Sequence, residues 1–587
     1  MYPRRRFFEE TAAVFRKTGR SVPVFQDKHL STRWDECVAQ VAASRRLGFP
    51  YLAGSSLPVT WRIPSVEIPN GTDLEESVAV CYGGVDSYDF HGYETAQCMS
   101  ERRRGGETGI RSVRAIKGEA LCAWVDGRAT ADVAAQKTAT ADLKLRKTAD
   151  LAAQMSNSEW LNSMPGTPQQ KYFMLGCVGC HSLERIVRSK YDADGFLSTV
   201  QRMSTYANQT TPLNPQKRLT TRDTEPVGED RVRVQRTQAD FLASINLSQS
   251  STWEYALKPL PRPKGKATQV IYTEYDLPKP TIEPHDVVLD PEGNAWYSNF
   301  GGQTLGKIDP KTGKHTEYPV PELKKGSPVG ALSLRNDREG NLWLGMMYQA
   351  AIAKFDRKSE KFQTWPIPAE MNKANTQVNM TSPWNIAVDG KVWSQNNGFA
   401  GIHRIDLKTG KWETWEPFKA SPQGHNIYDV VADSKNNAFF TDIGREHVGR
   451  IDAKTGEITT WQTDLKNSGP RRGMVDAQDR LWTALNRTDS VSVLDPKTGK
   501  FDLYSTGIPE YYAYDVWIDK HGEAWTATEY ADRVVRINTQ TREAVPYLLP
   551  SPTNMRRAHG DNRMKPAHFW VGATHTASIV RLEPLDQ

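Results

Sequence analysis

The most specific chemical motif in this chain is the segment Cys-Val-Gly-Cys-His, which contains Cys177, Cys180 and His181. Two thiols three residues apart can form thioethers to the two vinyl groups of one haem, and the histidine that follows can ligate its iron. The alternatives are a redox-active dithiol and half of a zinc site. A zinc site needs a second pair of soft ligands, and the other cysteines are far upstream and widely spaced: Cys37, Cys81, Cys98 and Cys122. We interpret the segment as a covalent attachment site for haem c.

The residues around this motif predict a helical domain over residues 150–256. Ser156 and Asp192 are residue types that cap the first turn of a helix. A helix after Asp192 would place three apolar side chains on one face, at positions i, i+4 and i+7: Phe196, Val200 and Met203. A last helix is expected over residues 237–247, with the polar interval 208–236 as a surface loop.

This arrangement resembles a mono-haem cytochrome c domain, whose last helix packs across the one that bears the motif. The resemblance implies a methionine sulfur as second axial ligand of the haem iron, opposite His181. Met203 is the candidate, although a methionine on an apolar helix face is also a common core residue. Three other methionines follow it as candidates: Met155, Met164 and Met174.

Composition bounds the rest of the chain. Its 587 residues exceed what one core supports, so about three domains are expected. The net charge of +6 comes from interspersed acidic and basic residues, which does not indicate a nucleic-acid partner. The lack of an apolar run near 20 residues predicts no membrane span. Seventeen Trp, 42 Gly and 35 Pro are typical of an all-β repeat protein with many turns.

A repeat follows a proline-rich linker over residues 257–267. Seven short phrases of the Gly-Lys-Ile-Asp type recur at intervals of 43 to 50 residues, and each has an aromatic residue about a dozen positions earlier. The phrases end at Asp309, Asp356, Asp406, Asp452, Asp495, Asn538 and Glu583. This period fits a blade of four short strands with a Lys-Thr-Gly hairpin turn. Residues 268–587 are therefore predicted to form a seven-bladed β-propeller, in a chain that is mainly β with a small all-α domain.

The two ends of this repeat array predict how the ring closes. The seventh repeat stops at Glu583 without an outer strand, whereas residues 268–275 precede the first repeat and match the outer-strand phrase at 315–319. The N-terminal strand should complete the last blade and so remove an open sheet edge.

Side chains at the start of each innermost strand should face the central funnel, where propellers bind ligands. The repeats align to place His285 there, together with the aromatic and basic residues Trp384, Tyr428, Tyr514, Arg471, Arg472, Arg556 and Arg557. Such a funnel suits an anionic, partly aromatic small molecule. The alternative is that the arginines pair with Asp286, Asp429 and Asp515 and serve the fold.

The first blade carries Pro-His-x-Val, then Asp-x-x-Gly-x-x-Trp and Gly-x-Ile-Asp, and this pattern resembles the streptogramin B lyases, also called virginiamycin B lyases. The resemblance covers residues 268–587 and implies a seven-bladed propeller. It also implies elimination by a histidine base with Mg²⁺ nearby. The family's Glu-Pro-His motif is matched by Glu283, Pro284 and His285, and another family glutamate by Glu529. Where the family has a second Pro-His histidine, the adjoining blades have Gly330 and Arg557.

The N-terminal region gives no clear pattern over residues 1–127. Residues 128–149 alternate small and polar residues and resemble the last strands of a carboxypeptidase regulatory-like domain. Haem is attached to Cys-x-x-Cys-His outside the bacterial cytoplasm, yet residues 1–10 are polar and contain no signal peptide. We therefore expect a periplasmic or otherwise exported protein, and hypothesise that part of residues 1–127 reflects a wrong start or a shifted reading frame, with a divergent region as the alternative.

Three function classes fit these observations. The first is a periplasmic c-type haem protein that transfers electrons to a partner protein while the propeller binds a ligand or substrate. The second is a carbon–oxygen lyase with His285, aided by Glu283, as its catalytic residues. The third is a propeller that binds a ligand without catalysis.

Overall fold

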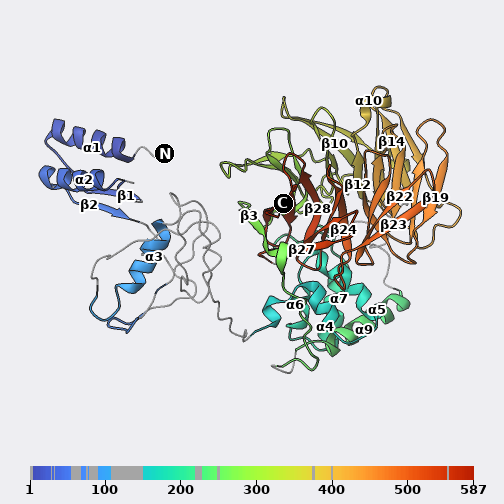
Figure 1. Cartoon of the computed structure of the whole chain (residues 1–587), viewed down its shortest axis with the longest axis horizontal. Coiled ribbons are helices and arrows are strands. Elements are labelled where there is room, and N and C mark those ends of the chain that lie inside the picture. The colour runs from blue at the N-terminus through green and yellow to red at the C-terminus, as the bar shows by residue number, and fades with distance from the viewer. Residues whose placement is uncertain are drawn as a thin grey trace. The chain divides into compact units, whose positions relative to one another are not determined.

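The fold was analysed in a computed structural model (Figure 1). It describes residues 4–27, 29–31, 33–54, 68–74, 77, 90–106, 150–217, 228–247, 252–372, 377–397, 401–551 and 554–586. The chain divides into two compact units, residues 1–149 and 150–587, which are described separately. The strands expected over residues 128–149 lie outside the described residues.

The N-terminal unit contains helices and a small parallel sheet. Its described elements are α1 (Arg4–Thr18), β1 (Val24–Asp27), α2 (Trp34–Leu47), β2 (Tyr51–Gly54) and α3 (Phe90–Ser100), with β1 parallel to β2. Phe8 and Ala12 of α1 pack on Phe49, and all three are buried. Only a few positions of α1 are both apolar and buried, and many of the others are charged and exposed.

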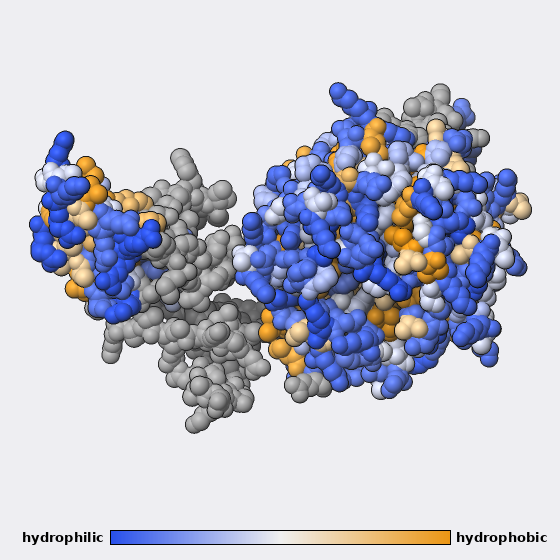
Figure 2. Space-filling view, turned by 90° about the horizontal axis from the view of Figure 1, so that it is seen from above, coloured by the Kyte–Doolittle hydropathy of each residue, from blue (hydrophilic) through white to orange (hydrophobic). Residues whose placement is uncertain are grey.

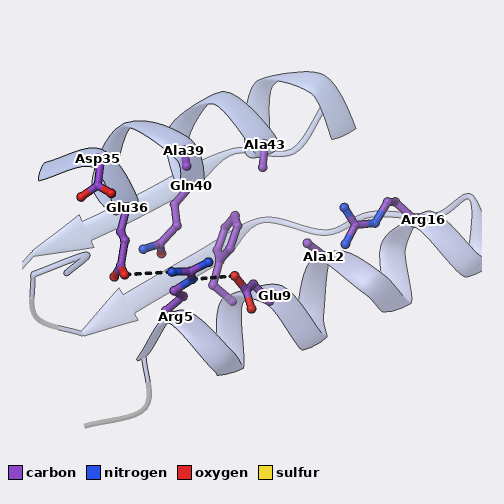
Figure 3. Close-up of a pocket in the computed structure, with 10 residues that line it drawn as sticks. Arg5, Glu9, Ala12, Arg16, Asp35, Glu36, Ala39, Gln40 and Ala43 are labelled. Carbon is purple, nitrogen blue, oxygen red and sulfur yellow. Dashed lines mark hydrogen bonds and ion pairs between the residues drawn. The ribbon is translucent and has the colours of Figure 1, made fainter. Parts of the chain in front are cut away.

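A shallow groove of about 210 Å³ lies between α1 and α2 (Figure 3). Arg5 crosses it and donates hydrogen bonds to Glu9 at 2.7 Å and to Glu36 at 2.9 Å. The charged groups at this end of the groove therefore compensate one another.

The C-terminal unit begins with a helical module, residues 150–247. Its elements are η4 (Ala152–Gln154), α4 (Asn157–Ser163), α5 (Pro168–Tyr172), η5 (Phe173–Gly179), α6 (Leu183–Val187), α7 (Ala193–Met203) and α9 (Glu229–Ser244). Both predicted caps are present: Ser156 forms a capping box with Glu159, and Asp192 accepts a hydrogen bond from the Gly195 amide at 2.9 Å. The interval 208–236 was wrongly expected to be loop throughout. α9 begins at Glu229, because Glu229 and Asp230 are favourable in a first turn.

The rest of the unit is built from short antiparallel strands. They are β3 (Val270–Asp276), β4 (Pro284–Leu289), β5 (Ala295–Asn299), β6 (Thr304–Ile308), β7 (His315–Pro319), β8 (Leu334–Asn336), β9 (Leu342–Gly345), β10 (Ala351–Asp356), β11 (Lys361–Pro366), β12 (Gln377–Ser382), β13 (Lys391–Asn397), β14 (Gly401–Asp406), β15 (Trp412–Trp415), β16 (Ile427–Ala432), β17 (Ala438–Asp442), β18 (His447–Ile451), β19 (Ile458–Gln462), β20 (Pro470–Val475), β21 (Leu481–Leu485), β22 (Ser490–Asp495), β23 (Lys500–Ser505), β24 (Ala513–Ile518), β25 (Glu523–Thr528), β26 (Arg533–Asn538), β27 (Ala544–Leu548), β28 (Met555–Asp561), β29 (His568–Ala573) and β30 (Ser578–Pro584). Short helical turns interrupt them at η6 (Gly265–Thr268), η7 (Ala369–Met371) and α10 (Ile386–Asp389).

These strands form a ring of four-stranded sheets, which is the arrangement of a β-propeller. Among the described residues, five sheets are separate, and an eight-stranded sheet joins two further four-stranded groups through one bridge, between Arg557 of β28 and Asp286 of β4. The innermost strand of each sheet contacts the innermost strand of the next sheet. The predicted closure is confirmed: β3 pairs along its whole length with β30 and so completes the sheet of β28, β29 and β30.

The repeated residues stabilise each sheet in the same way. Asp290 before β5 accepts a hydrogen bond from the Trp296 indole at 2.8 Å, and Asp337 accepts one from Trp343 at 2.9 Å. The glycine of the Lys-Thr-Gly turn has a positive φ, as at Gly313 (φ 70°), which favours glycine. The sequence period thus reflects one turn and one buried aromatic residue per blade.

The surface seen in Figure 2 is mainly hydrophilic, with apolar side chains in small separate groups. None of the helices among the described residues is both long and apolar enough to span a membrane.

Candidate functional site

The Cys-x-x-Cys-His segment lies against the end of the propeller where the innermost strands begin. The Asn554 side-chain amide donates to the Val178 carbonyl at 2.8 Å, and the Arg556 guanidinium donates to the Gly179 carbonyl at 3.3 Å. Both residues are at the start of β28 or just before it. The helical module and the propeller therefore meet where the Cys-x-x-Cys-His segment contacts the funnel residue Arg556.

Further contacts hold the helical module in this position. The Ser158 amide donates to the Tyr530 carbonyl at 2.9 Å, and its hydroxyl donates to the Glu510 carbonyl at 2.6 Å. Tyr530 itself is part of the apolar core of the module, beside Trp160. Figure 1 shows the helices gathered against the propeller. The module is thus packed on the blades rather than tethered to them.

The linker contributes to the same interface. Its Leu260 amide donates to the buried Glu159 carboxylate at 2.7 Å, and its Lys258 amide donates to the Ser163 hydroxyl at 2.7 Å. Leu260 is itself buried. The proline-rich segment therefore follows the α4 surface as an ordered connection.

The motif residues that could hold haem lie at the edge of the module core. Cys177 packs against this core, in which Met174, Val178 and Leu183 are fully buried. Burial and the neighbouring Cys180 raise the pKa of Cys177 to about 12. The Nδ1 atom of His181 lies 3.1 Å from the Ser182 carbonyl. A hydrogen bond from Nδ1 to this carbonyl would leave Nε2 able to ligate a metal.

A histidine of the propeller, His575, lies beside this segment. It follows Thr574, whose hydroxyl donates to the Asn554 carbonyl at 2.9 Å, and Asn554 in turn contacts Val178. The Nε2 atom of His575 is buried and has no hydrogen-bond partner among the described residues. Burial, Arg556 and His181 lower the pKa of His575 to about 4. Sequence reasoning missed this residue because it belongs to a loop of the last blade.

The methionines lie in two kinds of surroundings. Met203 ends α7 and is 41 % exposed. The other three named candidates, Met155, Met164 and Met174, are buried in the module core. No described contact brings Met203 to His181, so its role as axial ligand stays a prediction.

The funnel contains arginine–carboxylate pairs that are almost completely buried. Arg472 binds both oxygens of Asp286, at 2.8 and 2.9 Å, and Arg335 binds Asp429 at 2.6 Å. Against the effect of burial, Arg472 holds the pKa of Asp286 below its usual value. The carboxylates also accept amide hydrogens from the next blade, as Asp286 does from Leu334 at 3.0 Å. The alternative reading, that these pairs serve the fold, thus has direct structural support.

A second arginine pair surrounds Glu529. Its carboxylate accepts from Arg471 at 2.8 Å and pairs with Arg556 at 2.6 Å. Although burial opposes it, these two guanidinium groups hold the pKa of Glu529 below its usual value. Arg471 also lies over the ring of Tyr514, 3.8 Å from its centroid. Because Arg556 contacts both Glu529 and Gly179, it connects this pair to the motif.

His285 is the centre of a chain of hydrogen bonds across the funnel. Its Nδ1 lies 2.8 Å from Asp286, and its Nε2 lies 3.2 Å from the hydroxyl of Tyr514, which lies 2.8 Å from that of Tyr428. Burial lowers the pKa of His285 to about 3. The imidazole is therefore neutral at ordinary pH.

Glu283 is buried beside this chain. Burial raises the pKa of its carboxyl to about 8, and its Oε2 atom has no partner among the described residues. Asn379 of β12 is also buried, and both side-chain polar atoms lack a partner in the described part of the chain. Buried polar atoms usually have partners, so these atoms indicate a place for a polar ligand or water.

The donor set does not suit Mg²⁺, which takes oxygen ligands in octahedral geometry. Both oxygens of Asp286 are taken by Arg472, and Glu529 is paired with two arginines. Glu283, with its pKa near 8, is the exception, and one carboxyl group does not make a magnesium site.

Two of the predicted funnel residues lie differently from the rest. Trp384 is 53 % exposed and follows the end of β12, because the Asp-x-x-Gly turn used for alignment is replaced there by α10. In the same blade Asn379, which lies within β12, is buried where Trp384 is not. Arg557 lies farther from its carboxylate, with Nε 3.9 Å from Asp515.

Neither a protein-family model nor a curated protein matches this chain. Solved structures with similar folds include a virginiamycin B lyase from Staphylococcus aureus (18% identity, 54% of this chain and 99% of that chain, TM-score 0.46) and a streptogramin B lyase (17%, 55% and 99%, 0.47). The extracellular domain of a hybrid two component system from B. thetaiotaomicron is also similar (12%, 54% and 40%, 0.41). These scores are too low to support a conclusion, and the propeller assignment rests on the strand pairings.

Proposed function

We propose that this chain is an exported c-type haem protein that exchanges electrons between a ligand in the propeller funnel and a partner protein. The observation that carries the proposal is the contact of Val178 and Gly179 with Asn554 and Arg556. The contact supports the proposal because Arg556 touches both the motif segment and Glu529 of the funnel. A haem on this segment would border the residues around His285.

The haem would be held by thioethers from Cys177 and Cys180 and by the imidazole of His181. When bound, haem c accepts and donates single electrons at its iron. The second axial ligand is Met203 in the cytochrome interpretation, and the buried Nε2 of His575 makes that residue a second candidate.

The funnel residues would bind and orient the ligand. Five guanidinium groups (Arg335, Arg471, Arg472, Arg556 and Arg557) face four carboxylates (Asp286, Asp429, Asp515 and Glu529), so 5 − 4 leaves one positive charge while Glu283 is protonated. This balance favours an anionic ligand, and the rings of Tyr428 and Tyr514 favour an aromatic one.

The decisive experiment is an absorption spectrum of the full chain expressed in a host with haem-attachment machinery. We expect covalent haem with a sharp band after reduction, and its loss in the double variant Cys177→Ala/Cys180→Ala. The same substitution at Cys37 is the control. A colourless mature protein would contradict the proposal.

The axial ligand can be determined on the same material. Met203→Ala should abolish the near-infrared band of ferric methionine-ligated haem if the sulfur is bound, and His575→Ala should convert a bis-histidine spectrum to a high-spin one if the imidazole is bound. Leu242→Ala, in the module core, is the control for indirect effects.

A carbon–oxygen lyase is the second candidate function, favoured by the neutral, buried His285 with Asp286 orienting its Nδ1. His285 would remove the proton and Arg471 would stabilise the developing anion. Turnover would then survive the loss of both motif cysteines. Ligand binding without turnover in either state would leave a non-catalytic propeller.

A further inference from the structure

A second group of ionisable side chains lies in the fourth blade, outside the funnel. His425 precedes β16, Asp442 ends β17 and His447 begins β18. One potential ligand atom from each of the three lies within 4.8 Å of the others. The loop before β16 and the hairpin between β17 and β18 meet at this end of the blade. Asp442 is thereby brought next to His425, 17 positions before it, and His447, 5 positions after it.

The carboxylate of Asp442 is held in a fixed orientation. Its Oδ1 atom accepts from the amides of Asn426 at 2.7 Å and Gly444 at 3.0 Å. The other oxygen, Oδ2, lies 2.6 Å from Nδ1 of His425 and 3.9 Å from Nδ1 of His447. Asp442 is fully buried, and among the described residues no ion pair links it to Arg or Lys.

Both imidazoles are also oriented by neighbours. Phe418 stacks on the His425 ring at 3.8 Å between centroids and 9° between planes. The side-chain amide nitrogen of Gln462 lies 3.0 Å from Nε2 of His447. A half-turn of this amide would present its oxygen instead, and Nε2 would then carry the hydrogen. Nδ1 then keeps its lone pair toward Asp442, as a metal ligand does when its other nitrogen donates to a neighbour.

Nδ1 of His447 is a buried atom with no hydrogen-bond partner in the described part of the chain. This nitrogen and the Asp442 oxygen 3.9 Å from it could both bind one cation placed between them. The arginine nearest in sequence, Arg445, is directed elsewhere, because its guanidinium donates to the Gln423 carbonyl at 3.0 Å.

We propose that His425, Asp442 and His447 bind one divalent transition-metal ion, Zn²⁺ or a metal of similar ligand preference. Two imidazole nitrogens and one carboxylate oxygen are the donors of such ions, whereas Mg²⁺ and Ca²⁺ take oxygen ligands. The side chains of His425 and His447 are 12% and 19% exposed, so solvent can supply the remaining ligand. This site is independent of haem and of the proposed function.

The test measures Zn²⁺ uptake by the full-length chain, with metals counted by mass spectrometry so that zinc is distinguished from iron. We expect one Zn²⁺ per chain. His425→Gln, Asp442→Asn and His447→Gln should each weaken the affinity by at least about 10- to 100-fold, the loss found for residues that merely support ligands. Zn²⁺ should also raise the melting temperature of the wild-type chain and of no ligand variant.

His568→Gln is the matched control. His568 is 18% exposed and lies 3.9 Å from one carboxylate, Glu583, without a second histidine. The His568→Gln variant should bind Zn²⁺ as tightly as the wild type does. The proposal is overturned if the wild type takes up no Zn²⁺ or if all three ligand variants bind it equally well. A proton shared by His425 and Asp442 that Zn²⁺ does not displace, seen by NMR, would also overturn it.

Discussion

Two histidine–aspartate pairs of this propeller have similar geometry and different chemistry. His285 and Asp286 lie 2.8 Å apart in the funnel, and His425 and Asp442 lie 2.6 Å apart in the fourth blade. Asp286 also binds Arg472 through both oxygens, whereas Asp442 uses its second oxygen for two backbone amides. The two pairs therefore differ in the group that binds the carboxylate besides the histidine.

This difference determines what each pair can do. A guanidinium beside Asp286 satisfies the negative charge permanently, so His285 stays neutral and no cation is needed. Asp442 instead faces two backbone amides and two imidazoles, and an imidazole binds either a proton or a metal ion. The same two residue types thus give a permanently neutral imidazole in one place and, as proposed above, a metal site in the other.

The largest effect is expected from removing the guanidinium. Arg472→Met leaves Asp286 buried without its partner, which should lower the free energy of unfolding by about 3–5 kcal/mol. Chemical denaturation followed by tryptophan fluorescence measures it. Arg563→Met, in a pair whose arginine is 53% exposed, should cost no more than about 1 kcal/mol. Equal losses in both variants would show that the buried pair is not special.

Glu283 should make stability depend on pH. Its folded pKa is about 8 and its ordinary value is 4.5, so the protonated form is favoured by folding. The resulting stabilisation is complete below pH 4.5 and is lost as pH rises through 8. The loss is about 2–4 kcal/mol. Glu283→Gln should remove this dependence, and the exposed Glu322→Gln should leave it. An unchanged pH profile in Glu283→Gln would contradict the burial argument.

The two aspartates should respond unequally to the same substitution. Asp442→Asn keeps an oxygen for both backbone amides and should lower the free energy of unfolding of the metal-free protein by less than about 1 kcal/mol. Asp286→Asn leaves Arg472 buried without a counter-charge and should cost several-fold more. Denaturation in the presence of a chelator measures both. A large loss at Asp442 would mean that its charge stabilises the blade without metal.

The smallest expected effect concerns the haem. Arg556→Gln removes a positive charge next to Gly179. Removing this charge stabilises the oxidised iron, so the reduction potential should fall by on the order of tens of millivolts. Spectroelectrochemical titration measures it, with Arg563→Gln as the control. A potential that rises, or stays unchanged, would argue against haem at the funnel mouth.

The repeat period and the Asp–Trp turns could be read from sequence because each depends on residues close together in one blade. The same holds for the Ser156 and Asp192 caps. The closing strand could be read because it matches the outer-strand phrase of the first repeat. Trp384 was placed in the funnel by a turn that its blade lacks, and the start of α9 was missed because its first turns are mainly charged.

By itself the sequence determined local patterns: a Cys-x-x-Cys-His motif, helix caps, and a blade repeated until the ring closes. The tertiary structure decided which side chains meet, because those contacts join residues far apart in the sequence, such as Val178 with Asn554 and Asp286 with Arg472. Charge compensation depends on such contacts. An aspartate beside a histidine acquires its role only when folding supplies, or withholds, the arginine.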